Sequence, residues 1–158
     1  MKVEYINPFV LSSVNVFSTM LGCELTRGDV TTKRDRRPSC EITGVIGLSG
    51  KAAGTVAVGL SREAALGSAE AMLMEPQTNL NADVIDVVGE LTNMIAGGAK
   101  AELSQFDMSI SLPVVITGSS HSIDFPRSAT PILIPFSSKW GDVCIEVGLV
   151  EQVEVVAV

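Results

Sequence analysis

The sequence predicts a single α+β domain over residues 1–158, with an antiparallel or mixed β-sheet flanked by long helices and an internal pseudo-duplication. Three observations lead to this fold class. Residues 7–21 and 81–105, one stretch in each half of the chain, have the apolar spacing of helices. Each half also carries two β-like runs joined by a short turn. The second arms of these hairpins, VAVGL at 56–60 and IEVGL at 145–149, are alike, which favours a duplication.

The first 38 residues are expected to form a helix, a short strand and a turn. Asn7 is the predicted N-cap of the helix, with Pro8 at its first position and Gly22 at its end. Weak alternation over 23–32 suggests a strand. The basic run KRDRRP at 33–38 is interpreted as a solvated turn, and its alternative is a patch that steers an acidic partner.

The rest of the first half is predicted as a hairpin and a helix. Residues 40–48 and 52–60 have the composition of two strands, and Ser49-Gly50 supplies the turn between them. Ser61 then caps a helix that extends to Met74.

The stretch 81–105, NADVIDVVGELTNMIAGGAKAELSQ, is predicted as the central helix, capped by Asn81. At about 100° per residue, one side is apolar and suited to the core: Val84, Val87, Val88, Leu91, Met94 and Ile95. The opposite side, within roughly 80°, carries Asp86, Glu90, Asn93, Gly97 and Lys100. The glycines at 89, 97 and 98 each cost about 1 kcal/mol relative to Ala, so we expect close approach of another backbone there.

After the central helix the chain is expected to be β. Residues 108–117 form a predicted strand that contains Pro113, which indicates a sheet edge or a bulge. Residues 118–126 have a loop composition. A second hairpin is predicted from residues 129–137 and 143–150, joined through 139–142.

Composition indicates an aliphatic core and excludes some partners. Hydrophobic residues make up 46% of the chain and aromatic residues only 4%, and a chain of this length buries roughly 68–70% of its unfolded surface. The net charge of −7 argues against nucleic acid as the main partner, because phosphate binding needs a basic face.

The cysteines and the apolar runs predict a soluble cytoplasmic protein. Cys23, Cys40 and Cys144 are scattered and odd in number, so we expect free, mostly buried thiols in a reducing compartment. Polar residues interrupt the N-terminal apolar stretch, which argues against a signal peptide. No run reaches the length of a membrane span, so no membrane partner is expected.

The usual catalytic sets are nearly absent. His121 is the only histidine, and its GSSHS context is typical of an ordinary surface loop. No dinucleotide-binding motif or P-loop is present. Asp83, Asp86 and Glu90 lack the further oxygen ligands of a cation site, so no metal site is predicted.

The polar side of the central helix, Asp86-x3-Glu90-x2-Asn93-x3-Gly97, resembles the D/S-x3-E-x2-N-x3-G pattern of the CheC/CheX/FliY chemotaxis phosphatases. The N-terminal segments VEYINPF and NVFSTM and the order of elements are most similar to the CheX branch. The resemblance covers essentially the whole chain. It implies a sheet flanked by helices with internal pseudo-symmetry, and a homodimer.

The same resemblance implies a hydrolase that dephosphorylates a CheY-like response regulator. Glu90 would pair with the regulator's active-site lysine, and Asn93 would orient the water that attacks the aspartyl phosphate. Mg²⁺ would be supplied by the regulator, and this chain would bind no cofactor. In the family a second site often lies on the first helix; here Ser12 stands where Glu would be needed, although Asn15 is present, so one site per chain is expected.

The residue chemistry agrees with these roles. An amide both donates to and accepts from a water without titrating, and a carboxylate suits a lysine partner. Glu90 and Asn93 are neighbours at i, i+3 and would enter a cleft together. Gly97 would let a partner approach closely, and Asp86 would support Glu90 or touch the rim of the partner.

Two other classes of function remain open. One is a non-catalytic module that binds a receiver domain, in chemotaxis or another two-component pathway. The intact Glu90/Asn93 pair argues against it. The other is a structural component of the flagellar switch, like FliY, and the expectation of one domain argues against that.

Overall fold

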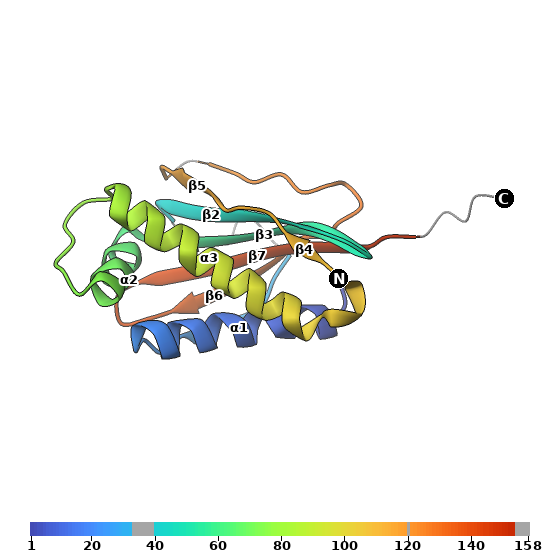
Figure 1. The fold of residues 1–158 in the computed structure, drawn as a ribbon, viewed down its shortest axis with the longest axis horizontal. Helices are drawn as coiled ribbons and strands as arrows, with labels where there is room; N and C mark the ends of the chain where they lie inside the picture. Colours follow the sequence, from blue (N-terminus) through green and yellow to red (C-terminus); the bar gives the residue numbers. More distant parts are fainter. Residues whose placement is uncertain (33–39, 120, 154–158) are drawn as a thin grey trace.

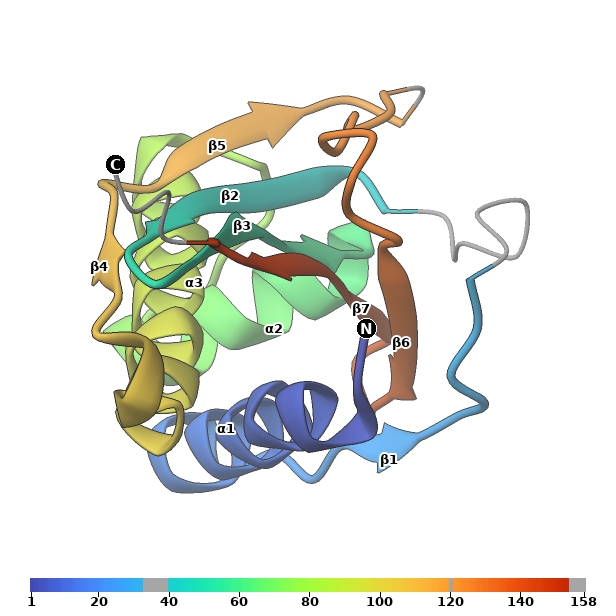
Figure 2. The ribbon, with the colours of Figure 1, turned by 90° about the vertical axis from the view of Figure 1, so that its right-hand side faces the viewer.

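Within the residues that the structure describes, three helices pack against one face of a seven-stranded sheet (Figures 1 and 2). The computed structural model describes residues 1–32, 40–119 and 121–153. Its helices are α1 (Val3–Leu21), α2 (Arg62–Leu73) and α3 (Ala82–Glu102), with a 3-10 turn at Ser104–Phe106. Its strands are β1 (Thr26–Arg27), β2 (Ile42–Ser49), β3 (Ala52–Leu60), β4 (Ser109–Ile110), β5 (Val114–Thr117), β6 (Ile132–Ser137) and β7 (Asp142–Glu151).

All pairings among the described strands are antiparallel, in the order β1-β6-β7-β3-β2-β4, and β5 also pairs with β2. The predicted α+β class is therefore confirmed, with an antiparallel rather than a mixed sheet. The order also gives the two similar hairpins equivalent places in the sheet. The β2–β3 and β6–β7 hairpins meet at the β3–β7 pair, where Val56 lies opposite Val147. The repeated segments VAVGL and IEVGL thus lie in the two central strands.

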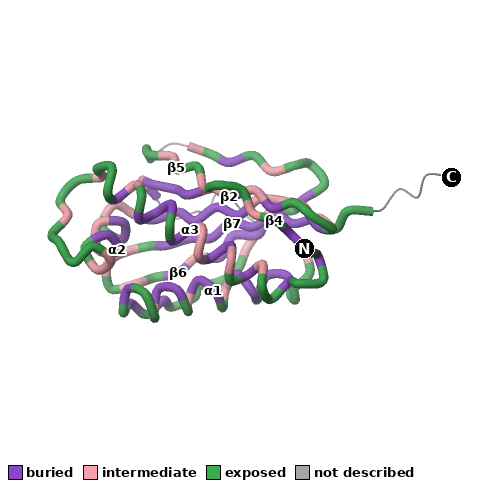
Figure 3. The backbone as a smooth tube through the Cα atoms, in the orientation of Figure 1, coloured by how far each residue is buried: buried purple, intermediate pink, exposed green. Residues whose placement is uncertain are grey.

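The main core lies between the helices and this sheet. Buried residues line the inner sides of α1 and α3 and run through the central strands (Figure 3). Phe9 and Phe17 of α1 and Leu91 and Ile95 of α3 are fully buried. The core is otherwise aliphatic, as the composition predicts.

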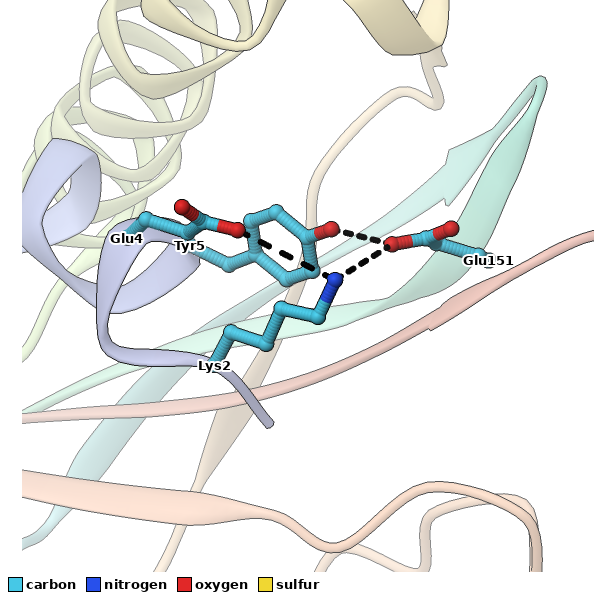
Figure 4. A network of polar contacts seen from close by, with 4 residues as sticks. All are labelled: Lys2, Glu4, Tyr5 and Glu151. Carbon is cyan, nitrogen blue, oxygen red and sulfur yellow. Dashed lines mark hydrogen bonds and ion pairs between the residues drawn. The ribbon is translucent and has the colours of Figure 1, made fainter.

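The start of α1 differs from the prediction. The helix begins at Val3, so the prediction that Asn7 caps it is wrong. Tyr5 is buried and donates a hydrogen bond to the Glu151 carboxylate of β7. Lys2 Nζ lies 3.6 Å from the same carboxylate, Glu151 Oε1 (Figure 4). These contacts with the end of the sheet stabilise a first turn that local signals do not predict.

The two predicted hairpins are confirmed as β2–β3 and β6–β7. Ser61 and Asn81 cap α2 and α3 as predicted, accepting hydrogen bonds from the backbone amides of Ala64 (3.2 Å) and Val84 (3.0 Å). The predicted strand 108–117 is divided into β4 and β5 around Pro113, and both pieces pair with β2 near the sheet edge. A proline cannot donate to the ladder, which explains the break.

The predicted strand over 23–32 is wrong except at β1 and at a single bridge between Thr31 and Leu133. In this stretch Cys23 and Leu25 are buried and most of the remainder is exposed, so little apolar surface holds it on the sheet. The basic run 33–38 lies outside the described residues.

Residues 121–131 lie over the other face of the sheet. His121 Nε2 is 2.9 Å from Thr43 Oγ1 of β2, and His121 Nδ1 is 2.8 Å from the Gly118 carbonyl oxygen. The interpretation of His121 as an ordinary surface residue is therefore incomplete, because the ring is half-buried and anchors the segment to the sheet. All three cysteines are buried, as predicted, and Cys40 Sγ lies 3.4 Å from Cys144 Sγ without a disulfide bond.

Candidate functional site

The inner side of α3 fixes this helix on the sheet. The predicted apolar residues are buried, except Met94, which is half-buried. Thr92 lies directly over Gly44 of β2, where a Cβ on Gly44 would come within 2.8 Å of Thr92 Cβ. The Thr92 hydroxyl donates to the Val88 carbonyl oxygen at 2.7 Å and so remains paired in the core. This contact between small residues brings α3 close to the sheet.

α1 holds α3 from one side. Ser12 is buried, and its Oγ donates to the Ile95 carbonyl oxygen at 2.8 Å. A Cβ on Gly98 would contact Ser12 Oγ and lie 3.2 Å from Ser12 Cβ. The expected close approach is therefore found at Gly98, with a side chain rather than a backbone as the neighbour. Ser12 has a packing role here, whereas Asn15 is exposed.

The outer side of α3 carries the four residues that the sequence singled out. Asp86 and Glu90 are exposed, and Asn93 and Gly97 are half-buried. Their spacing of four, three and four residues places them on successive turns. We call these four residues the polar ridge. Among the described residues, the side chains of Asp86, Glu90 and Asn93 have no hydrogen-bond or ion-pair partner, so they are available to a ligand.

Gly97 is not required by the packing of the chain. A Cβ at this position would meet nothing within 4 Å. At Gly89 a Cβ would make only ordinary contacts, 3.5 Å from Val115 and 3.6 Å from Pro113. Gly97 therefore costs α3 about 1 kcal/mol relative to Ala without a compensating internal contact. Its bare backbone at the end of the polar ridge suits close approach from outside.

A hollow of about 300 Å³ lies beside the polar ridge, between the end of α2 and the start of α3. It is lined by three apolar and three acidic residues: Met72, Leu73, Val87, Asp83, Asp86 and Glu90. Sequence reasoning missed the α2 side, because Met72 and Leu73 are equally good packing residues of a helix. The sequence signal that could have indicated this side of the hollow is the run of apolar residues that continues to the end of α2. In the structure, Leu73 is 39% exposed and Met74 is 89% exposed there.

This arrangement provides positioning groups and charge. In the described part of the chain, no three His, Cys, Asp or Glu side chains come together in a way that could hold a metal ion. None of the described helices is long and apolar enough to cross a bilayer. The ridge offers an amide that can orient a water and carboxylates that can attract a cation.

A family model described as "Chemotaxis phosphatase CheX" matches residues 42–137. The chain is similar to the solved chemotaxis protein CheX from Vibrio vulnificus, with 37% identity, a TM-score of 0.87 and coverage of 94% of this chain and 100% of that one. It is also similar to a CheC-like superfamily protein from Shewanella sp. PV-4, with 35% identity, a TM-score of 0.87 and coverage of 95% of this chain and 99% of that one. For the CheX–CheY–BeF3–Mg²⁺ complex from Borrelia burgdorferi the identity is 22% and the TM-score is 0.81, with coverage of 94% of this chain and 99% of that one. At this identity the similarity shows the fold alone. No curated protein sequence matches.

Proposed function

The chain belongs to the CheX family of chemotaxis phosphatases, and we propose that it hydrolyses the aspartyl phosphate of a CheY-like response regulator. In this proposal the polar ridge of α3 enters the regulator's active site. The observation that carries the proposal is the pair of Glu90 and Asn93, which lie one turn apart on a firmly packed helix. Their side chains make no hydrogen bond or ion pair to another described residue. The similar fold of the Borrelia burgdorferi CheX, solved with CheY, supports this kind of partner.

Asn93 orients the attacking water in this mechanism. Its amide can accept from and donate to one water and so hold it in line with the scissile P–O bond. The water oxygen bonds to phosphorus, the bond to the aspartyl oxygen breaks, and the regulator recovers its carboxylate. The water's proton leaves with the inorganic phosphate or passes to solvent.

Glu90 fixes the geometry through charge. Its exposed carboxylate pairs with the regulator's active-site lysine and so sets where Asn93 lies. Asp86 supports this contact or meets the rim of the regulator, and Gly97 lets the two backbones approach. Mg²⁺ held by the regulator supplies neutralisation of the phosphoryl oxygens, and this chain contributes no cofactor.

The test is the decay of a phosphorylated CheY-like receiver with wild type, Asn93→Ala and Asn15→Ala. Asn15 is an exposed amide on α1 and serves as the matched control. Wild type and Asn15→Ala should accelerate decay equally, whereas Asn93→Ala should be slower by on the order of 10²-fold, as for loss of one transition-state contact. Wild-type turnover in Asn93→Ala would refute the mechanism. Tight binding without acceleration would instead identify a receiver-binding module.

We also propose a cytoplasmic homodimer that assembles through a sheet edge. The β4–β5 edge exposes Leu112 (88%) and Val114 (63%), and an uncovered apolar edge favours pairing with another chain. Light scattering should give a dimer for wild type and a monomer for Val114→Lys. A wild-type monomer at micromolar concentration would contradict this assembly.

A further inference from the structure

We propose that the hollow between α2 and α3 receives a long cationic side chain, lysine or arginine, from the regulator surface beside its phosphorylation site. The inference rests on the proposed function and extends it from the catalytic pair to the choice of partner. The regulator's active-site lysine, assigned to Glu90 above, is a separate group. The hollow would make the end of α2 a determinant of which regulator is accepted.

The lining of the hollow matches the two parts of such a side chain. Val87 is 4% exposed and forms part of its base, whereas Leu73 is 39% exposed at its α2 wall. Asp83 and Asp86 are exposed at its rim. Lysine and arginine bury their aliphatic stems on apolar surface and keep the charged end at the polar edge. A wholly apolar or an acidic side chain would leave one half of this surface unmatched.

Charge complementarity also favours a cation. Between residues 61 and 95 the chain has six acidic residues and one arginine, a net charge of −5, so most of the total of −7 lies here. That arginine, Arg62, donates to the Thr78 carbonyl oxygen at 3.1 Å. Among the described residues, Asp83, Asp86 and Glu90 have no ion-pair partner. The field at this end of the molecule therefore attracts positive charge.

The end of α2 adds to this field. The helix ends beside the hollow, and its last turn contains no basic residue. Its unsatisfied carbonyl groups place partial negative charge at that end. At the start of α3, by contrast, the Asn81 side chain already satisfies one amide hydrogen, which moderates the positive end of the α3 dipole.

The hollow is continuous with the polar ridge, because Asp86 and Glu90 belong to both. A regulator docked on Glu90 and Asn93 would therefore cover the hollow. Water would be partly excluded from the rim, where charge pairs contribute more than on an open surface. Asp83 and Leu73 belong to the hollow but not to the ridge, so they separate the two contributions.

The experiment measures the Kd of a CheY-like receiver domain loaded with beryllium fluoride and Mg²⁺, by fluorescence anisotropy at several salt concentrations. Asp83→Asn, which leaves the polar ridge unchanged, should raise Kd by about fivefold and weaken its salt dependence. Leu73→Ser should raise Kd by about threefold through lost apolar contact. Glu70→Gln is the matched control, since it removes the same charge from an exposed position outside the hollow; its Kd should stay within about twofold. Circular dichroism checks folding.

Several outcomes would overturn the proposal. Equal effects of Asp83→Asn and Glu70→Gln would show that only the general field matters, and an unchanged Kd in Asp83→Asn would show that the hollow is not occupied. When the receiver's surface lysines and arginines are replaced singly by Met, one replacement should make the Kd insensitive to Asp83→Asn. If none of them does so, the occupant of the hollow is not a cationic side chain. If wild type binds in this way yet does not accelerate hydrolysis, the proposed function fails and the docking contact stands.

Discussion

Two adjacent glycines of α3 should respond oppositely to alanine. At Gly97 the new Cβ would meet nothing within 4 Å, so Gly97→Ala removes only the cost of glycine in a helix. The free energy of unfolding should rise by about 0.5–1 kcal/mol. At Gly98 the new Cβ would contact Ser12 Oγ and lie 3.2 Å from Ser12 Cβ.

The magnitude at Gly98 follows from how little Ser12 can move. Ser12 is buried, and turning its hydroxyl away would give up the 2.8 Å hydrogen bond to the Ile95 carbonyl oxygen. Overpacking of this kind costs about 1–3 kcal/mol, against a gain of about 1 kcal/mol from helix propensity. Gly98→Ala should therefore lower the free energy of unfolding by up to about 2 kcal/mol, and Ser12→Ala in the same chain should recover part of that loss.

Gly97→Ala should raise the free energy of unfolding but lower the turnover. If the polar ridge enters a regulator, a methyl group there occupies the contact surface, and turnover at subsaturating regulator should fall about tenfold because small displacements are costly. Urea unfolding followed by circular dichroism gives the stability, and receiver dephosphorylation gives the turnover. Equal destabilisation by Gly97→Ala and Gly98→Ala would refute the packing argument. A more stable Gly97→Ala with wild-type turnover would remove Gly97 from the partner surface.

Three further predictions concern the scaffold. Gly44→Ala should lower the free energy of unfolding by about 1–3 kcal/mol in chemical denaturation, because its Cβ would lie 2.8 Å from Thr92 Cβ; Thr92→Ala should restore part of it. The hydrogen bond from Tyr5, and then the charge of Lys2, hold the pKa of Glu151 below its ordinary value of 4.5. The carboxylate therefore stabilises the fold above that value and loses this contribution as the pH falls through the lower folded pKa. The difference in Tm between wild type and Glu151→Gln should be largest at neutral pH and should shrink as the pH falls below 4.5. A thiol reagent should label none of the three cysteines in the folded protein and all three in denaturant, because all are buried.

Features set by local chemistry could be predicted from the sequence, and those set by distant contacts could not. Asn81 and Ser61 cap helices through backbone amides three residues away, so their own sequence determines the geometry. The first turn of α1 depends on Glu151 at the other end of the chain, which no local pattern indicates. For the same reason the stretch after Gly22, which has few buried side chains, forms much less strand than its alternation suggested.

The same division applies to the candidate site. The polar ridge follows from the period of one helix, so the sequence alone places Glu90 and Asn93 on one face. The hollow depends on how α2 packs against α3, and a single helix pattern carries no information on that packing. Its α2 residues, Met72 and Leu73, differ from ordinary core residues only in their exposure, which is a tertiary property.

Two close contacts on the inner side of α3 fix the position of the polar ridge, which its proposed catalytic role requires. Thr92 on Gly44 sets the distance of the helix from the sheet, and Gly98 against Ser12 sets its distance from α1. An orienting amide works only if the backbone that carries it is fixed, since catalysis by positioning is lost with small displacements. Gly44→Ala should therefore lower the maximal rate of dephosphorylation more than it weakens regulator binding, although Gly44 lies on the sheet beneath the helix. An equal loss in both would mean that α3 presents a docking surface whose exact placement does not matter for the reaction.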